Sequence, residues 1–166
     1  MANNYHGKTI LGELMDDLTV DSVDSTQAVF VGKQTGGNLW VEIYCGTTPV
    51  VIEDDEVLEF YLQTCSSSTL GDHEAPISYA NAGGQPNATG TVAHAATDVL
   101  NADEATYGVY IKAHTNGITY TTGDLIAEIG IPDTMMRLCG HEYVQLKMIE
   151  TTTVAGSIDA FVVARA

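Results

Sequence analysis

The segment from residue 125 to residue 164 most constrains the fold, because turn residues divide it into three short runs. In the first two runs every second residue is apolar, which places those side chains on one face of an extended strand. The apolar positions are Leu125, Ala127, Ile129 and Ile131 in the first run, and Val144, Leu146 and Met148 in the second. Pro132 ends the first run because it has no N–H to donate, and Gly156 marks the turn before the last apolar run, 158–164. The pattern predicts three β-strands.

Similar runs occur earlier in the chain and are again closed by Gly, Pro or Asp. They cover residues 28–32, 39–46, 49–52, 56–64 and 106–114. In the second of them, Leu39, Val41, Ile43 and Cys45 alternate with Trp40, Glu42 and Tyr44. Asn116–Gly117 predicts a hairpin, because both residues tolerate the positive φ angles of a type I′ turn. No helix-length crossover separates the runs, so we expect them to pair antiparallel. The predicted fold is an all-β antiparallel β-sandwich or jelly roll of about eight strands.

Two segments depart from this rhythm. Near the N-terminus, Leu11, Leu14, Met15 and Leu18 are spaced as on one face of a helix, and a short helix and an extended arm are both open alternatives. Residues 65–105 are rich in Ser, Thr, Ala, Asn and Gly and show little periodicity, which is typical of a long functional loop. We therefore expect an N-terminal arm or short helix over residues 1–25. A single jelly-roll domain would then follow over residues 26–166, with a loop insertion at about 65–105.

The charge balance excludes two classes of partner. The chain carries 6 Lys and Arg against 22 Asp and Glu, which gives a formal net charge of −16. A surface this negative repels phosphate backbones and anionic membranes, so we expect no nucleic-acid partner and no membrane partner. No apolar run reaches the length of about 18 residues that a membrane-spanning helix needs. The N-terminus also lacks the basic and apolar regions of a secretory signal.

The candidate reactive groups form no recognisable catalytic or metal-binding motif. The cysteines are Cys45, Cys65 and Cys139, and no two of them have CxxC spacing. We expect Cys45 to be a small buried side chain of its strand. The four carboxylates of residues 53–56 lack EF-hand spacing, and Cys139 and His141 have no identifiable third group to orient them. The sequence therefore predicts no enzyme activity, with no catalytic residue, no cofactor and no metal site.

Several stretches resemble one protein family. One is residues 56–77, an apolar strand that ends in Leu62-Gln63-Thr64 and runs into a polar loop. The others are Ile131-Pro132, the strand from Tyr143 to Lys147, and Ala155-Gly156 followed by the last strand. These stretches resemble the jelly-roll capsid cement (decoration) proteins of tailed double-stranded-DNA bacteriophages. The resemblance covers roughly residues 26–75 and 123–165, through short apolar motifs.

The resemblance implies a non-enzymatic structural protein of a virion. Such a protein is assembled in the cytoplasm of the bacterial host and lies on the outer surface of the capsid. Its partners would be the phage major capsid protein, whose neighbouring subunits it clamps, and further copies of itself in a dimer or trimer. The residues that we expect to make capsid or oligomer contacts are Leu11, Leu14, Met15, Leu18, Trp40, Tyr44, Asp72, His73 and Tyr79. The alternative is a carbohydrate- or receptor-binding β-sandwich module of a virion, which would expose aromatic side chains beside Asp or Asn.

Overall fold

The computed structural model describes residues 8–21, 23–24, 27–32, 38–53, 56–65, 68, 109–115, 117–131, 140–151 and 153–165. Over these residues the chain is all-β, with eleven strands and no helix. The strands are β1 (Lys8–Thr19), β2 (Val23–Asp24), β3 (Val29–Phe30), β4 (Leu39–Cys45), β5 (Val50–Ile52), β6 (Val57–Cys65), β7 (Val109–Thr115), β8 (Ile118–Tyr120), β9 (Leu125–Gly130), β10 (Tyr143–Thr151) and β11 (Ser157–Arg165). The predicted insertion at about 65–105 lies almost wholly outside the described residues.

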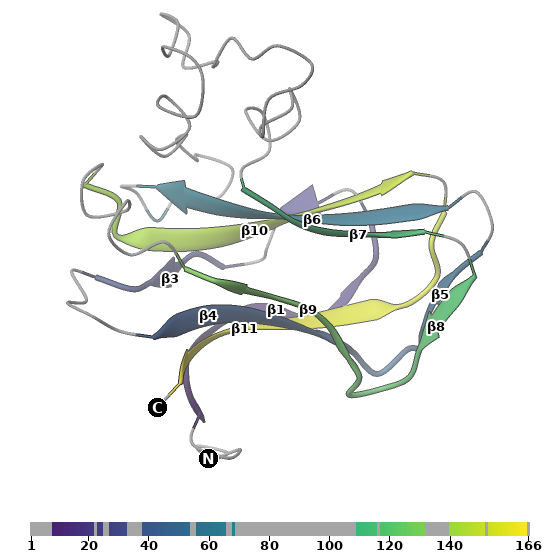
Figure 1. The fold of residues 1–166 in the computed structure, drawn as a ribbon, viewed down its shortest axis with the longest axis horizontal. Coiled ribbons are helices and arrows are strands. Elements are labelled where there is room, and N and C mark those ends of the chain that lie inside the picture. The colour runs from purple at the N-terminus through teal and green to yellow at the C-terminus, as the bar shows by residue number, and fades with distance from the viewer. Residues whose placement is uncertain are drawn as a thin grey trace, which may run out of the picture.

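The long strands form two antiparallel sheets packed face to face, as the sequence predicts. Sheet A has the strand order β1-β11-β4-β9, and sheet B has the order β2-β10-β6-β7, with β3 also paired to β10. Figure 1 shows the two sheets as stacked layers, with the short pair β5–β8 at one end of them. The protein is therefore an antiparallel β-sandwich.

Three successive strand pairs form one ribbon that passes from sheet A to sheet B. β4 pairs with β9, β5 with β8, and β6 with β7. The hairpin predicted at Asn116–Gly117 is therefore wrong, because the strands on either side of it pair with different partners in different sheets. Gly117 does have a positive φ of 69°, but the chain here turns a corner of the sandwich instead of folding back on itself.

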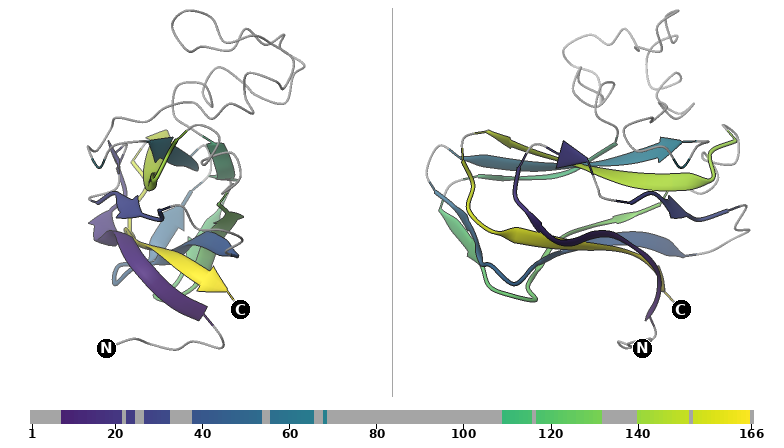
Figure 2. Two further views of the ribbon diagram at one scale, coloured as in Figure 1. Left: turned by 90° about the vertical axis from the view of Figure 1, so that its left-hand side faces the viewer. Right: turned by 180° about the vertical axis from the view of Figure 1, so that it is seen from behind.

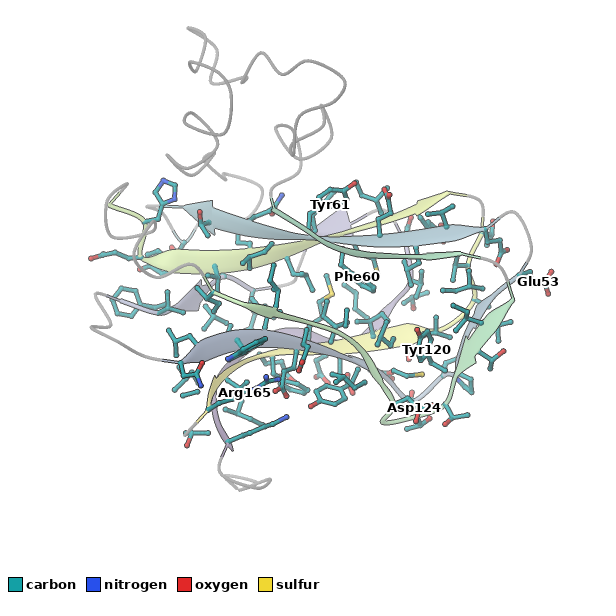
Figure 3. All side chains as sticks on the ribbon, in the orientation of Figure 1. Glu53, Phe60, Tyr61, Tyr120, Asp124 and Arg165 are labelled. Carbon is teal, nitrogen blue, oxygen red and sulfur yellow. The ribbon has the colours of Figure 1, made fainter. Side chains whose placement is uncertain are left out.

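The core lies between the sheets and is formed by the alternating apolar positions. Leu58, Phe60 and Leu62 of β6 are fully buried, and so are the apolar positions predicted on β4 and β10. Figure 3 shows Phe60 in the layer between the sheets and its neighbour Tyr61 on the opposite side of β6. Leu125 departs from the prediction: its side chain is 45% exposed, while Ile126 is buried. A register shift opposite Ile43/Tyr44 reverses the alternation at this end of β9.

The N-terminal segment is a strand over Lys8–Thr19, so the short helix considered for residues 1–25 is wrong there. β1 pairs with β11 along sheet A, which Figure 2 shows from behind the molecule. Register shifts interrupt this pairing at three places along β1. Each bulge breaks the two-residue alternation, and the apolar residues therefore fall at intervals that resemble helical spacing. Of the two alternatives, the segment is therefore the extended one over these residues, and it is paired into sheet A as a strand of the sandwich, with Leu14 and Met15 fully buried in the core.

The face of sheet B that points away from the core is also buried at its centre. Tyr61 is 1% exposed, Gln63 is 2% exposed and Gln145 is fully buried, although all three lie opposite the core-facing residues of β6 and β10. At the end of β6, the Thr64 hydroxyl lies 2.8 Å from His141 Nδ1. Sheet A differs, because several side chains on its outer face remain partly exposed.

A candidate binding face on sheet A

The outer face of sheet A, which is the face turned away from the core, carries an open cavity of about 360 Å³. Strands β1, β4 and β11 form its floor, and the connections after β4 and after β8 form one wall. The residues that line it are Lys8, Ile10, Glu42, Tyr44, Cys45, Gly46, Thr47, Thr122, Gly123, Asp159, Phe161 and Val163. Figure 3 shows Arg165 on this outer side of sheet A and Asp124 at the turn between β8 and β9. We call this cavity the sheet A pocket.

At one end of the sheet A pocket, a buried carboxylate collects four hydrogen bonds. Glu42 is only 2% exposed although it lies on the outer face. Its Oε1 accepts from Lys8 Nζ at 2.8 Å and from Arg165 Nε at 2.9 Å and Nη2 at 2.5 Å, and its Oε2 accepts from the Tyr44 hydroxyl at 2.6 Å. Arg165 also pairs with Glu128 and lies over the Trp40 ring, 4.0 Å from its centroid. We call this group the Glu42 cluster.

The partners of Glu42 decide its protonation state. Burial by itself raises the pKa of Glu42, but the hydrogen bonds from Lys8, Tyr44 and Arg165 more than offset it, so the pKa lies below the ordinary 4.5. The pKa of Tyr44 is raised, first by burial and then by its hydrogen bond to Glu42. Glu42 is therefore ionised at neutral pH, and Tyr44 is a permanent donor to it.

A second carboxylate fixes the other end of the sheet A pocket. Asp17 Oδ1 accepts hydrogen bonds from the Ser157 hydroxyl at 2.5 Å and from the Thr47 N–H at 2.8 Å, and Asp17 Oδ2 accepts from the Thr47 hydroxyl at 2.6 Å. The Asp17 N–H in turn donates to Asp159 Oδ1 at 2.7 Å. Asp17 has a φ of 45°, in the left-handed region, at one of the β1 bulges. Side chains from β11 and from the connection after β4 therefore hold this bulge in place.

The lowered pKa values of these carboxylates predict how the stability of the protein depends on pH. The hydrogen bonds lower the pKa of Asp17 and Asp124 below 3.8, as they lower that of Glu42 below 4.5. A carboxyl whose pKa is lower in the folded state stabilises the protein above its unfolded-state pKa, and that contribution is lost as the pH falls through the folded-state pKa. We expect the free energy of unfolding to fall progressively below about pH 4.5. Urea titrations between pH 7 and pH 3 measure this, and a Glu42→Gln variant should show a shallower decline.

The middle of the sheet A pocket is apolar and aromatic. The rings of Tyr44 and Phe161 lie 6.3 Å apart, tilted at 54°, and Ile10 and Val163 complete the floor. Cys45, whose side chain is buried as predicted, contacts the carbonyl oxygens of Tyr120 and Thr48 through its Sγ. Burial raises the pKa of its thiol. An aromatic floor between two polar ends is typical of a surface that binds part of another molecule.

The structure separates the residues that the sequence grouped as contacts. Trp40 and Tyr44 lie on the outer face of sheet A, and Tyr44 lines the pocket. Leu14 and Met15 are core residues with no exposed surface, so their prediction as contacts is wrong, because the bulges of β1 turn them inward. Leu18 is partly buried against the core, and Leu11 is 40% exposed. The remaining predicted contacts, Asp72, His73 and Tyr79, lie outside the described residues.

Sequence reasoning missed Lys8, Asp159, Phe161 and Arg165 as members of the site. Their only sequence signal is alternation in the last strand, where Asp159, Phe161 and Arg165 fall opposite the core positions. What joins them to Tyr44 and Glu42 is the strand register, in which Asp159 is opposite Tyr44 and Phe161 is opposite Glu42. These pairs are more than 100 positions apart, so no local pattern predicts them.

The acidic turn, His141 and Cys139 were the other candidate groups in the sequence. They either have structural roles or lie outside the described residues. At the acidic turn, the Glu53 N–H donates to Glu56 Oε2 at 2.7 Å, while residues 54 and 55 are outside the described part. His141 is buried beside Thr64, and Cys139 is outside the described part of the chain. In the described ranges, no group of three or more His, Cys, Asp or Glu side chains is arranged to hold a metal ion. The same ranges contain no helix long and apolar enough to cross a membrane.

Comparisons of this chain with protein-family models, with curated proteins and with solved structures found no match.

Proposed function

We propose that this protein is a non-enzymatic cement protein of a bacteriophage virion, which binds the outer face of the capsid and joins neighbouring major capsid subunits. The observation that carries the proposal is the strand order, β1-β11-β4-β9 facing β2-β10-β6-β7. From this order, and from the ribbon that folds over through β5 and β8, we infer a jelly roll. Viral capsid and lectin domains share this fold. A fold of this kind supports the proposal by analogy, and the resemblance in residues 26–75 and 123–165 points the same way.

The charge and the edges of the sandwich support a role on a shell exterior. A net charge of −16 is repelled by packaged DNA, which favours the outer surface of a capsid over the inner one. β1 is an edge strand of sheet A, and its residues Ile10 and Leu11 are 47% and 40% exposed. An open strand edge with exposed apolar side chains is suited to contact with another chain. We propose that the Leu11 part of β1 contacts the shell, and that the protein associates with itself as a dimer or trimer.

Co-sedimentation with mature, empty shells tests the proposal. We expect the purified protein to pellet with the shells, to saturate at a fixed ratio to the major capsid protein, and to make the shells more resistant to heat. Deletion of residues 1–20 is unsuitable as a binding test, because it removes Leu14 and Met15 from the core. We expect the Leu11→Asp variant to lose pelleting, since a charge on this edge opposes an apolar contact.

Leu125→Asp is the matched control. Leu125 is 45% exposed on the other edge strand of sheet A, β9, so the two variants introduce the same charge at similar exposure. Equal loss of pelleting in both variants would contradict a contact through β1. If the wild-type protein fails to pellet with any mature shell, the cement function itself is wrong.

One observation favours the alternative, a carbohydrate- or receptor-binding module. Tyr44 and Phe161 are neighbouring aromatic side chains in the sheet A pocket, and Asp159 lies beside them. Aromatic rings beside a carboxylate are common in sugar-binding sites, where a ring stacks on the sugar and the acid accepts its hydroxyls. Binding in a glycan array without any pelleting on shells would support this alternative over the cement function.

A further inference from the structure

We propose that the sheet A pocket binds a cationic side chain, Lys or Arg, presented by an extended segment of a partner protein. The alkyl stem of that side chain would lie against Phe161 and Tyr44, and its charged group would lie beside Asp159. Only the identity of the partner rests on the proposed function, because the pocket residues by themselves set the chemistry of the contact.

The first support is the shape of the pocket. It is open to solvent and has a volume of about 360 Å³, which suits one long side chain and its flanking backbone. Phe161 and Val163 of β11 and Tyr44 of β4 form an apolar floor. Lys and Arg bury their alkyl stems on surfaces of this kind while the head group stays near water. A guanidinium or ammonium group over a Tyr or Phe ring is also attracted by the ring's negative face.

The second support is the charge around the pocket. Lys8 lines the pocket, and both Lys8 and Arg165 bind Glu42 in the Glu42 cluster and are partly buried. Asp159 lines the pocket, and Asp17 is joined to it by a hydrogen bond. Neither of these carboxylates, nor Glu13 or Asp16 near them, pairs with a Lys or Arg in the part of the chain that the structure describes. Burial is the main reason that the pKa of Glu13 is raised, and the charges of Asp16 and Asp159 raise it further, because these carboxylates repel one another. A positive group brought here relieves that repulsion.

The third support is the shortage of free donors, which favours a cation over a sugar. The Tyr44 hydroxyl donates to Glu42, the Thr47 hydroxyl donates to Asp17, and the Thr122 hydroxyl donates to the Thr47 carbonyl at 3.2 Å. Lys8 donates one of its three N–H groups to Glu42. Apart from Lys8, the side chains that line the pocket therefore offer mainly acceptors and ring faces. A sugar hydroxyl both donates and accepts, whereas an ammonium or guanidinium group only donates and matches this set.

Titration of the protein with short peptides tests the proposal. The probe is a capped five-residue peptide with a central arginine among threonines, and the reference peptide carries citrulline, the neutral isostere, at the same place. Amide chemical shifts of the isotope-labelled protein report binding. We expect the arginine peptide to shift resonances of β4 and β11 around the pocket and to saturate, and the citrulline peptide to bind at least about threefold more weakly.

Two pairs of variants locate the site. Asp159→Asn removes the charge but keeps an oxygen that can accept from the Asp17 N–H, and Phe161→Leu keeps an apolar side chain but removes the ring. We expect each to weaken binding of the arginine peptide by about threefold to fivefold. The controls are Glu53→Gln, which removes the same charge outside the pocket, and Phe30→Leu, which removes a ring that is 59% exposed on β3. We expect both controls to bind as the wild type does.

The outcomes separate this proposal from the proposed function. Equal binding of the two peptides, or equal losses in the pocket variants and their controls, would overturn the cationic pocket. So would saturable binding of a neutral oligosaccharide to the pocket when the arginine peptide fails to bind. Peptide binding without pelleting on shells would refute the cement function alone. Pelleting of the wild-type protein on shells, together with equal binding of the arginine and citrulline peptides, would refute the pocket alone.

Discussion

Replacing Glu42 with Ala is expected to lower the free energy of unfolding by about 3 kcal/mol, the low end of the range for removing one member of a buried ion pair. Glu42 is 2% exposed, and it is the common acceptor for Lys8, Arg165 and Tyr44. Its loss leaves two cations next to each other and the partly buried Tyr44 hydroxyl without its acceptor. Because Lys8 and Arg165 are 31% and 20% exposed, water can partly replace the lost contacts, and we do not expect a larger effect.

Glu128→Ala is the matched control for this prediction, because Glu128 pairs with the same Arg165 but is 40% exposed. An exposed pair of this kind contributes less than about 1 kcal/mol. Urea unfolding with an unchanged m-value measures both effects. Equal destabilisation by the two substitutions would mean that burial of Glu42 is not what makes the cluster stabilising.

Replacing Gly156 with Ala is expected to destabilise the protein by about 3–5 kcal/mol, through a clash and an unfavourable backbone angle together. Gly156 has a φ of 134°, and a Cβ there would lie 2.6 Å from the Val50 Cα and 2.8 Å from the Pro49 carbonyl oxygen. Backbone atoms cannot move aside as a flexible side chain does. The Gly156 carbonyl also accepts from the Val20 N–H at 3.0 Å, so a shift here would disturb the ends of both β1 and β11.

Gly123→Ala separates the two contributions. Gly123 has a φ of 86°, but no atom lies within 4 Å of the position of an added Cβ. We expect only the cost of the backbone angle, about 1–2 kcal/mol. Thermal and urea denaturation of both variants give the comparison. A Gly156→Ala variant no less stable than Gly123→Ala would show that the β4–β5 connection moves freely away from the start of β11.

Two-residue alternation predicted the core-facing side of most long strands, as the buried positions of β4, β6 and β10 show. The alternation failed to predict the buried face where the pairing between strands is irregular. Because of the bulges in β1, its apolar residues have a spacing like that of a helix, at Leu11, Leu14, Met15 and Leu18. In β9, a register shift reversed the alternation at Leu125. A bulge is set by pairing with a distant strand, so its position is not visible in the local pattern.

The candidate site was predictable only in part. Trp40 and Tyr44 were expected on the solvent side of their strand, and both lie on the outer face of sheet A. Glu42 lies on this outer face too, as the alternation predicts, yet its side chain is buried. Lys8 and Arg165, from the two ends of the chain, meet over it because β1 and β11 pair at these residues.

Side-chain periodicity and turn residues, both local properties of the chain, were enough to predict the all-β class, the antiparallel pairing and the inward face of most strands. Which strands are neighbours depends on pairing between distant segments and is seen only in the folded protein. The chain turns a corner of the sandwich at Gly117, because β7 pairs with β6 and β8 pairs with β5. The Glu42 cluster and the sheet A pocket also form only in the folded protein. Both depend on contacts between residues far apart in the chain, whose free energy is gained only once the two sheets have formed.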